Sequence, residues 1–265
     1  MYRVRIVFSI LAVLLTATGC QTTTSLNFVP TTSQEATFVE GSTAIKSALP
    51  NSTVIMSSAV REIENGSRID IVVNVNNISS ESFVLDTSSI SISSPSTGAL
   101  KVYSYDELVA EEKKRANASM AWAALAGALD TYAASYSGYQ TTTGTYSGTT
   151  YGSYSGNSYG TYSANTYGTY TGTTYNAAAA SQAINAASDR TSSNLQTIQQ
   201  TSGATLASLR NNILKKTTME PGMWYGGAVR FEAPALEEDE NRWYSLTIRL
   251  GKDVHTFELN QNIMK

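Results

Sequence analysis

Two stretches of the chain alternate hydrophobic and polar residues with the period of a β-strand. Residues 69–75 carry Ile or Val at every second position, and residues 244–250 carry Tyr, Leu or Ile in the same way. Successive side chains of a strand point to opposite faces, so this pattern predicts strands that are buried on one side. Turn residues stand beside both stretches, and we therefore predict two β-hairpins, which pair 54–63 with 68–76 and 242–250 with 254–259.

From Ser104 the period changes to that of a helix. Ser104 and Glu107 have the spacing of a capping box, and an alanine-rich sequence follows them. We predict helices over 105–134 and 177–217, the second with a break at Gly203, and expect them to pack through alanine as an antiparallel hairpin. A membrane-inserting hairpin is the alternative for the small-residue stretch within the first helix. Its larger apolar residues fall close to one stripe: Met120, Leu125, Leu129 and Tyr132.

An octad repeat separates the two predicted helices. Its tyrosines are spaced alternately by five and three residues: Tyr146, Tyr151, Tyr154, Tyr159, Tyr162, Tyr167, Tyr170 and Tyr175. In an extended strand the two tyrosines of each octad would point to opposite faces, so the segment has no single side to bury. It also lacks Leu, Ile, Val and Phe. We therefore predict a flexible loop over 135–176. The alternative is an adhesive segment, because Tyr with Ser, Gly and Asn makes adaptable contact surfaces.

Composition excludes several classes of protein. The 265-residue chain has one His and one Cys, which leaves no Cys/His zinc site and no internal disulfide framework. Its formal net charge is −3 and it contains no cluster of Lys and Arg, which argues against a nucleic-acid partner. Charged residues are only 15% of the chain, and none occurs between Thr131 and Ser188.

The N-terminus has the layout of an export signal. Arg3 and Arg5 form a positive start, and an apolar run over 6–15 follows them. A run of this length is too short for a stable membrane span, which needs about 20 residues. The segment Thr16-Ala17-Thr18-Gly19-Cys20 then places small residues directly before the only cysteine.

This segment resembles the lipobox of bacterial lipoproteins. The resemblance implies a signal peptide over 1–19 and a lipid anchor on Cys20, and in that family Gln rather than Asp after the cysteine, here Gln21, implies the outer membrane. Two or more acyl chains anchor a protein stably. Residues 20–50 are rich in Thr, Ser and small residues, and we predict that they form a flexible tether.

The two β blocks, 51–104 and 218–265, suit an antiparallel β-sandwich. They are similar to the Ig-like domains of periplasmic lipoproteins, in which Glu220-Pro221-Gly222 and the stretch from Gly227 to Phe231 would open the last strands. We therefore expect an α+β fold, in which an Ig-like sandwich is interrupted by a helical hairpin with a low-complexity tip.

Residues that could carry chemistry are few. His255 shares the strand parity of Phe257 and Leu259, which favours a structural position at the edge of the core over a Ser/His/Asp triad. The acidic run 237–240 lies between two predicted strands, where a solvated hairpin loop is the expectation and a weak calcium site the alternative. We expect no catalytic residue, no cofactor and no metal.

These observations favour a lipid-anchored, non-enzymatic protein of the cell envelope. In the first hypothesis the helical arm and the eight repeat tyrosines contact a surface or a protein of the cell envelope. In the second, the chain is an accessory subunit of a secretion, motility or export assembly, and the repeat is a spacer. Membrane attachment would come through Cys20, and self-association is left open.

Overall fold

The structure is a computed structural model that describes residues 22–39, 42–60, 62–155, 159–238 and 240–264. Cys20 and the predicted signal peptide lie outside these residues. The chain divides into two compact units. The first unit contains the residues up to Glu111 and those from Leu206 onward, and the second contains Glu112–Thr205.

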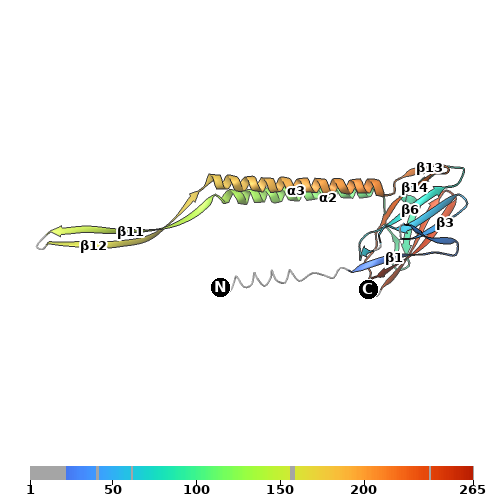
Figure 1. Cartoon of the computed structure of the whole chain (residues 1–265), viewed down its shortest axis with the longest axis horizontal. Helices are drawn as coiled ribbons and strands as arrows, with labels where there is room; N and C mark the ends of the chain where they lie inside the picture. The colour runs from blue at the N-terminus through green and yellow to red at the C-terminus, as the bar shows by residue number, and fades with distance from the viewer. Residues whose placement is uncertain (1–21, 40–41, 61, 156–158, 239, 265) are drawn as a thin grey trace. The chain divides into compact units, whose positions relative to one another are not determined.

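The first unit contains two six-stranded antiparallel sheets (Figure 1). One sheet has the order β5 (Ile63–Glu64), β1 (Thr23–Val29), β16 (Asp253–Ile263), β15 (Asn241–Leu250), β8 (Ile90–Ser94) and β9 (Gly98–Leu100). The other has the order β10 (Val102–Tyr103), β14 (Trp224–Phe231), β6 (Ile69–Asn77), β4 (Ser52–Ser58), β3 (Ser42–Ala48) and β2 (Gln34–Val39). A short pair joins β7 (Phe83–Leu85) to β13 (Thr217–Met219), and a 3₁₀ turn, η1, covers Thr87–Ser89.

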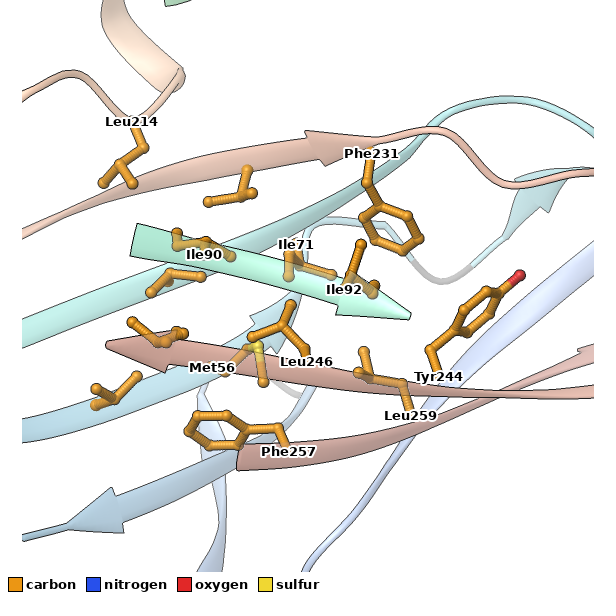
Figure 2. Close-up of a cluster of buried hydrophobic side chains, with 14 of the residues drawn as sticks. Met56, Ile71, Ile90, Ile92, Leu214, Phe231, Tyr244, Leu246, Phe257 and Leu259 are labelled. Carbon is orange, nitrogen blue, oxygen red and sulfur yellow. The ribbon is translucent and has the colours of Figure 1, made fainter. Parts of the chain in front are cut away.

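One hydrophobic core takes side chains from both sheets. The alternating residues of β6 and β15 that the sequence pattern singles out are buried there. Phe231 of one sheet lies edge-on to Tyr244 of the other, with 5.8 Å between ring centroids (Figure 2). Fully burying an aliphatic or aromatic side chain contributes about 1.5–3 kcal/mol each, so this shared core is the main source of the unit's stability.

The hairpin predicted over 242–250 and 254–259 is confirmed, and the predicted pairing of 54–63 with 68–76 is confirmed only as far as Ser58. Strand β4 pairs with β6, and β15 pairs with β16 from Leu250↔Asp253 outward. Between β4 and β6 the chain also visits the other sheet, because β5 pairs with β1. Strands β14 and β15 belong to different sheets, so the hairpin loop predicted at 237–240 is instead a connection between sheets.

The flexible tether predicted over 20–50 is wrong for the residues that the structure describes. Strands β1, β2 and β3 all fall within that range, and the β part of the chain begins at Thr23 instead of 51. In β1, Leu26 and Phe28 are buried at alternate positions while Thr23, Ser25 and Asn27 are not. The hydroxyl-rich composition concealed the strand, because Thr and Ser fill its outer positions.

Helices α2 (Tyr105–Tyr136) and α3 (Ala177–Asn212) occupy the predicted helical ranges. The capping box forms, since the Glu107 amide donates to Ser104 Oγ at 3.2 Å and the Ser104 amide donates to Glu107 Oε2 at 2.9 Å. The break predicted at Gly203 is wrong, because α3 continues through it. Helix α3 also ends before 217, where the Leu214 amide donates to the carbonyl of Ala228 on β14 at 2.9 Å.

In the second unit, α2 and α3 run side by side and meet through small residues (Figure 1). Ala116, Ala180 and Ala187 are buried, and a Cβ added to Gly127 would lie 2.2 Å from Thr191 Oγ1. Arg190 pairs with Asp130 across the two helices at 2.6 Å. The expected packing through alanine is therefore confirmed. Among the described residues, neither helix combines the length and the hydropathy that a membrane span requires.

Candidate functional site: the tyrosine ribbon

The octad repeat forms a two-stranded antiparallel ribbon, so the prediction of a flexible loop over 135–176 is wrong. Strand β11 (Tyr139–Ser155) pairs with β12 (Tyr159–Tyr175) without a bulge, from Tyr139↔Tyr175 to Ser155↔Tyr159. Figure 1 shows the two strands side by side along their length. Threonine and tyrosine favour extended backbone, and no proline interrupts either strand.

The register places tyrosines opposite glycines on one face of the ribbon. Tyr146 faces Gly168, and Gly144 faces Tyr170. A Cβ added to Gly168 would lie 2.4 Å from the Tyr146 ring, and one added to Gly144 would lie 2.5 Å from the Tyr170 ring. Each ring therefore lies over the glycine of the neighbouring strand, where any side chain would displace it. Aromatic rings that cover cross-strand glycines offset the loss of packing that glycine causes in a sheet.

The opposite face carries threonine, serine and the remaining tyrosines. Three successive cross-strand pairs there are Thr on Thr: Thr141↔Thr173, Thr143↔Thr171 and Thr145↔Thr169. Further along this face Tyr151 and Tyr167 are 80% and 76% exposed, the highest values among the large exposed hydrophobic side chains. Thr149 Oγ1 donates to Asn165 Oδ1 at 2.9 Å across the strands. This face therefore exposes a regular array of hydroxyl groups and aromatic rings to solvent.

The structure separates the eight predicted contact tyrosines by face. Tyr146 and Tyr170 belong to the tyrosine-glycine face, whereas Tyr151, Tyr167 and Tyr175 belong to the hydroxyl face. For Tyr154, Tyr159 and Tyr162 only the backbone register is described. The pairs Tyr146 with Tyr151 and Tyr170 with Tyr175 thus each place one ring on each face, as the odd spacing predicts.

A row of four tyrosines in ring contact continues from the ribbon to the end of α2. Tyr139 and Tyr175, a cross-strand pair, have ring centroids 4.9 Å apart, and Tyr136 lies 6.2 Å from Tyr139. The Tyr136 and Tyr132 hydroxyls are 2.8 Å apart. The hydrogen bond with Tyr132 raises the pKa of Tyr136 above the ordinary value for a phenol. Aromatic pairs in such edge-to-face and tilted contacts contribute about 0.5–1.5 kcal/mol each beyond their burial, so the row of tyrosines stabilises the base of the ribbon.

Gly138 and Asn176 pair where the ribbon joins the two helices. A Cβ added to Gly138 would lie 2.7 Å from the Tyr175 ring and 2.9 Å from Ala180 Cβ. The Asn176 amide donates to the Gly138 carbonyl at 2.7 Å, and the Ala179 amide donates to Asn176 Oδ1 at 3.1 Å. Asn176 thereby satisfies a free amide at the start of α3.

A row of large apolar side chains on α2 is exposed. Trp122 is 71% exposed, and Leu125, Leu129, Tyr132 and Tyr136 also face water. Their spacing alternates between three and four residues, which is the spacing of a helix-packing stripe. The sequence pattern pointed to part of this row, but only the structure shows that α3 packs against the small residues instead.

His255 lies inside the first unit, as its strand parity predicts. It is 1% exposed, and its ring nitrogens lie 2.9 Å from Ser52 Oγ and 2.9 Å from Ser47 Oγ. The Ser52 hydroxyl donates to Asp253 at 2.8 Å, so its oxygen is left to accept from the Nε2–H of His255. That places the imidazole proton on Nε2 and leaves Nδ1 to accept from Ser47. Imidazole therefore cannot act as a base toward Ser52, and the arrangement differs from a catalytic triad.

Burial lowers the pKa of His255 and outweighs the opposing effect of Asp253. Burial also opposes the ionisation of Asp253, but hydrogen bonds from Asn51 and Ser52 reverse that effect and hold its pKa below the ordinary value. His255 is therefore neutral and Asp253 charged at neutral pH. The group joins β16 of one sheet to β3 and β4 of the other.

The other candidates for chemistry do not form a site. Within the described residues no three His, Cys, Asp or Glu side chains gather closely enough to hold a metal ion. In the acidic run, Glu240 accepts from the Glu237 amide at 2.9 Å and pairs with Arg242 at 2.6 Å. The hydrogen bond from Glu237, together with Arg242, lowers the pKa of Glu240 against the effect of burial.

The glycines that fix the ribbon were not among the residues predicted from the sequence. The signal was present, because the repeat tyrosines at 146, 154, 162 and 170 are separated by even numbers of residues from glycines at 144, 152, 160 and 168. Residues of equal parity share a strand face.

Comparisons of the chain with family models, with curated proteins and with solved structures find no significant match.

Proposed function

We propose that this chain is a lipid-anchored, non-enzymatic protein of the bacterial cell envelope that makes contacts through the tyrosine ribbon, residues 139–175. The observation that carries the proposal is a ribbon of two 17-residue strands, without a charged residue, that exposes tyrosine on both faces. A spacer between two helices does not require exposed aromatic side chains. Exposed aromatic area favours association, so such a surface indicates a contact site.

The side chains of the ribbon suit contact with another molecule. Tyrosine offers a large amphipathic area and loses little conformational entropy on binding, while Ser, Thr and Asn supply hydrogen bonds. Several rings are held in place before a partner binds. They belong to the cross-strand Tyr–Gly pairs and to the row of Tyr132, Tyr136, Tyr139 and Tyr175. Such preorganisation reduces the entropic cost of association.

The rest of the chain is assigned supporting roles. Cys20 would carry the lipid that holds the protein at the outer membrane, as the lipobox-like segment implies. The first unit would be an Ig-like sandwich that serves as the platform, which is compatible with two six-stranded antiparallel sheets and a shared core. The neutral, hydrogen-bonded His255 supports a structural role for the one histidine.

The second candidate is an accessory subunit of an envelope assembly. The exposed row on α2 from Trp122 to Tyr136 favours it, because an apolar stripe with this spacing is suited to receive a partner helix. In that case the helices dock and the ribbon is a spacer.

Replacement of residues 139–175 by a short Gly/Ser linker distinguishes the two candidates. The contact function predicts that cells carrying this variant lose attachment to surfaces or neighbouring cells, while the protein stays in the membrane fraction at wild-type abundance. The matched control, Trp122→Ser with Leu125→Ser, leaves the ribbon intact and should retain attachment. The reverse result, with attachment lost only in the helix variant, would support the accessory subunit and overturn the ribbon proposal.

The anchor has its own test. The Cys20→Ser variant should leave the membrane fraction, and protease added to intact cells should cut the wild-type ribbon if it faces outward. A Cys20→Ser protein that still fractionates with the membrane would contradict the lipid anchor. Protection of the ribbon until the outer membrane is opened would place its contacts in the periplasm.

A further inference from the structure

The ribbon has two outer edges that no other strand covers. Strands β11 and β12 form a sheet of two, and no third strand within the described part of the chain pairs with either. Two-stranded ribbons without a buried face are marginally stable in water. Natural edge strands avoid association through charges, prolines or bulges, yet residues 139–155 and 159–175 contain no charge and no proline and pair without a bulge. The edges are therefore open to a further strand.

The octad sets a simple pairing rule. Within the chain, paired residue numbers sum to 314, which places tyrosines 146, 154, 162 and 170 opposite glycines 168, 160, 152 and 144. Because the repeat is eight residues long, any antiparallel register whose sum differs from 314 by a multiple of eight places tyrosines of this set opposite glycines again wherever the repeat extends. A shift by one residue would instead move the tyrosines to the other face.

Strand β12 satisfies this rule with a second copy of itself. A sum of 330 differs from 314 by two octads and pairs Tyr162 with Gly168 and Tyr170 with Gly160 of the other copy. The same pairs recur with the copies exchanged, so four Tyr–Gly pairs form around a two-fold axis at Asn165. An interface that is its own complement is the commonest route to a homodimer.

Strand β11 satisfies the rule in the same way. A sum of 298 pairs Tyr146 with Gly152 and Tyr154 with Gly144 of a second copy, around an axis at Thr149. Thr149 and Asn165 are cross-strand neighbours within the chain. The two-fold axes of the β12 and β11 dimers therefore lie at the same cross-strand pair, Thr149↔Asn165.

We propose that the partner of the tyrosine ribbon is a second copy of this chain, which adds to the sheet by antiparallel pairing of β12 with β12 or of β11 with β11. This inference rests on the proposed contact function of the ribbon and names its partner. The absence of charge means that two identical edges meet without repulsion, and the ribbon of the second copy completes a sheet of four strands. Pairing at both edges extends the sheet through further copies.

Disulfide trapping in the purified mature chain tests the proposal, with Cys20→Ser as the background. In the β12 dimer residue 165 faces itself, at a Cα separation of about 4.5–5.5 Å, within the range of about 4.4–6.8 Å that a disulfide spans. Asn165→Cys should therefore form a dimer under mild oxidation, and Thr149→Cys reports the β11 edge in the same way. The controls are Thr171→Cys and Thr143→Cys, on the same face, whose copies would stand twelve residues apart, about 41 Å at roughly 3.4 Å per residue.

Cross-linking at 165 or 149 at least tenfold faster than at its control supports pairing at that edge. Equal rates at all four positions would overturn the proposal. If cells that lack the ribbon still lose attachment in that case, the contact function stands and only the self-pairing fails.

A charge variant gives a second readout without cysteine chemistry. Asn165→Lys places two lysines opposite each other at the β12 axis and leaves the in-chain neighbour Thr149 neutral, whereas Asn165→Gln adds no charge. Like charges directly opposite each other cost up to about 1 kcal/mol, so the lysine variant should dimerise up to about fivefold more weakly in sedimentation at low salt. The double variant Asn165→Lys, Thr149→Lys should block both edges. Unchanged association in the double variant would contradict edge pairing.

Discussion

At the scale of single residues, the fit of the ribbon depends on where glycine lacks a side chain. Gly168 lies beneath the Tyr146 ring, whereas Gly148 and Gly172, in the same ribbon, have no atom within 4 Å of an added Cβ. Identical residues in one repeat therefore differ in function. Gly168 leaves room for a tyrosine ring. Gly148 and Gly172 raise the entropic cost of folding and gain no side-chain packing in exchange.

The pair Gly168→Ala and Gly172→Ala tests this difference. Gly168→Ala should displace the Tyr146 ring and reduce the protection of ribbon amides from hydrogen exchange. Gly172→Ala should leave protection equal or raise it, since removing glycine where there is room stabilises by about 0.4–1 kcal/mol. Equal loss in both variants would mean that the ring does not depend on the missing side chain.

His255 makes the first unit sensitive to pH. Burial holds its folded pKa below the unfolded value of 6.5, so the folded state disfavours the proton. The stability that comes from neutral His255 is therefore complete above pH 6.5 and declines as the pH falls below it. Chemical denaturation should show a lower free energy of unfolding at pH 5 than at pH 7.5. In His255→Gln, which keeps a polar side chain but does not titrate, this difference should shrink; an unchanged difference would assign the effect to other groups.

At the scale of elements, close approach decides how the helices pack. Small residues let α2 and α3 approach closely, and at Gly127 the Thr191 side chain occupies the space of the missing Cβ. The large apolar residues of α2 are consequently left outside. Hydrophobicity alone would have placed them at the helix–helix contact.

Two glycine substitutions separate packing from helix propensity. Gly127→Ala should force the helices apart and lower the melting temperature of the helical signal. Gly203→Ala has open space around it and should raise helix stability by about 0.5–1 kcal/mol, because alanine is the better helix former. Far-ultraviolet circular dichroism on both variants checks this. Matching shifts of the same sign would contradict a tight contact at 127.

At the scale of the whole molecule, the core of the two sheets is independent of the inserted second unit. Every residue of the main core comes from the segments before Glu112 and after Thr205. A chain in which a short Gly/Ser linker replaces residues 112–205 should therefore keep a cooperative unfolding transition. Trp224 and Trp243 remain in it as fluorescent probes, since Trp122 is removed. A gradual, non-cooperative transition would show that the unit needs the insertion.

Elements whose residues repeat with a clear period follow directly from the amino-acid sequence. Alternation of Ile and Val located β6, and Ser104 with Glu107 located the start of α2, because strand parity and capping act over a few neighbouring residues. The parity of His255 also placed it in the core. These features need no knowledge of distant segments.

The remaining features emerge only in the folded chain, because they depend on residues that are far apart in sequence. The composition around Leu26 and Phe28 predicts a tether, but β1 is a strand because it pairs with β16. The octads lack a hydrophobic face, but they form strands in which Tyr146 lies opposite Gly168. The sequence pattern put Leu125, Leu129 and Tyr132 on one stripe of α2, but their exposure follows from the packing of α3 against small residues such as Gly127. The local sequence pattern determines which face of a strand or helix carries a residue. The residues that this face contacts depend on the register between distant segments, and a short stretch of sequence does not specify that register.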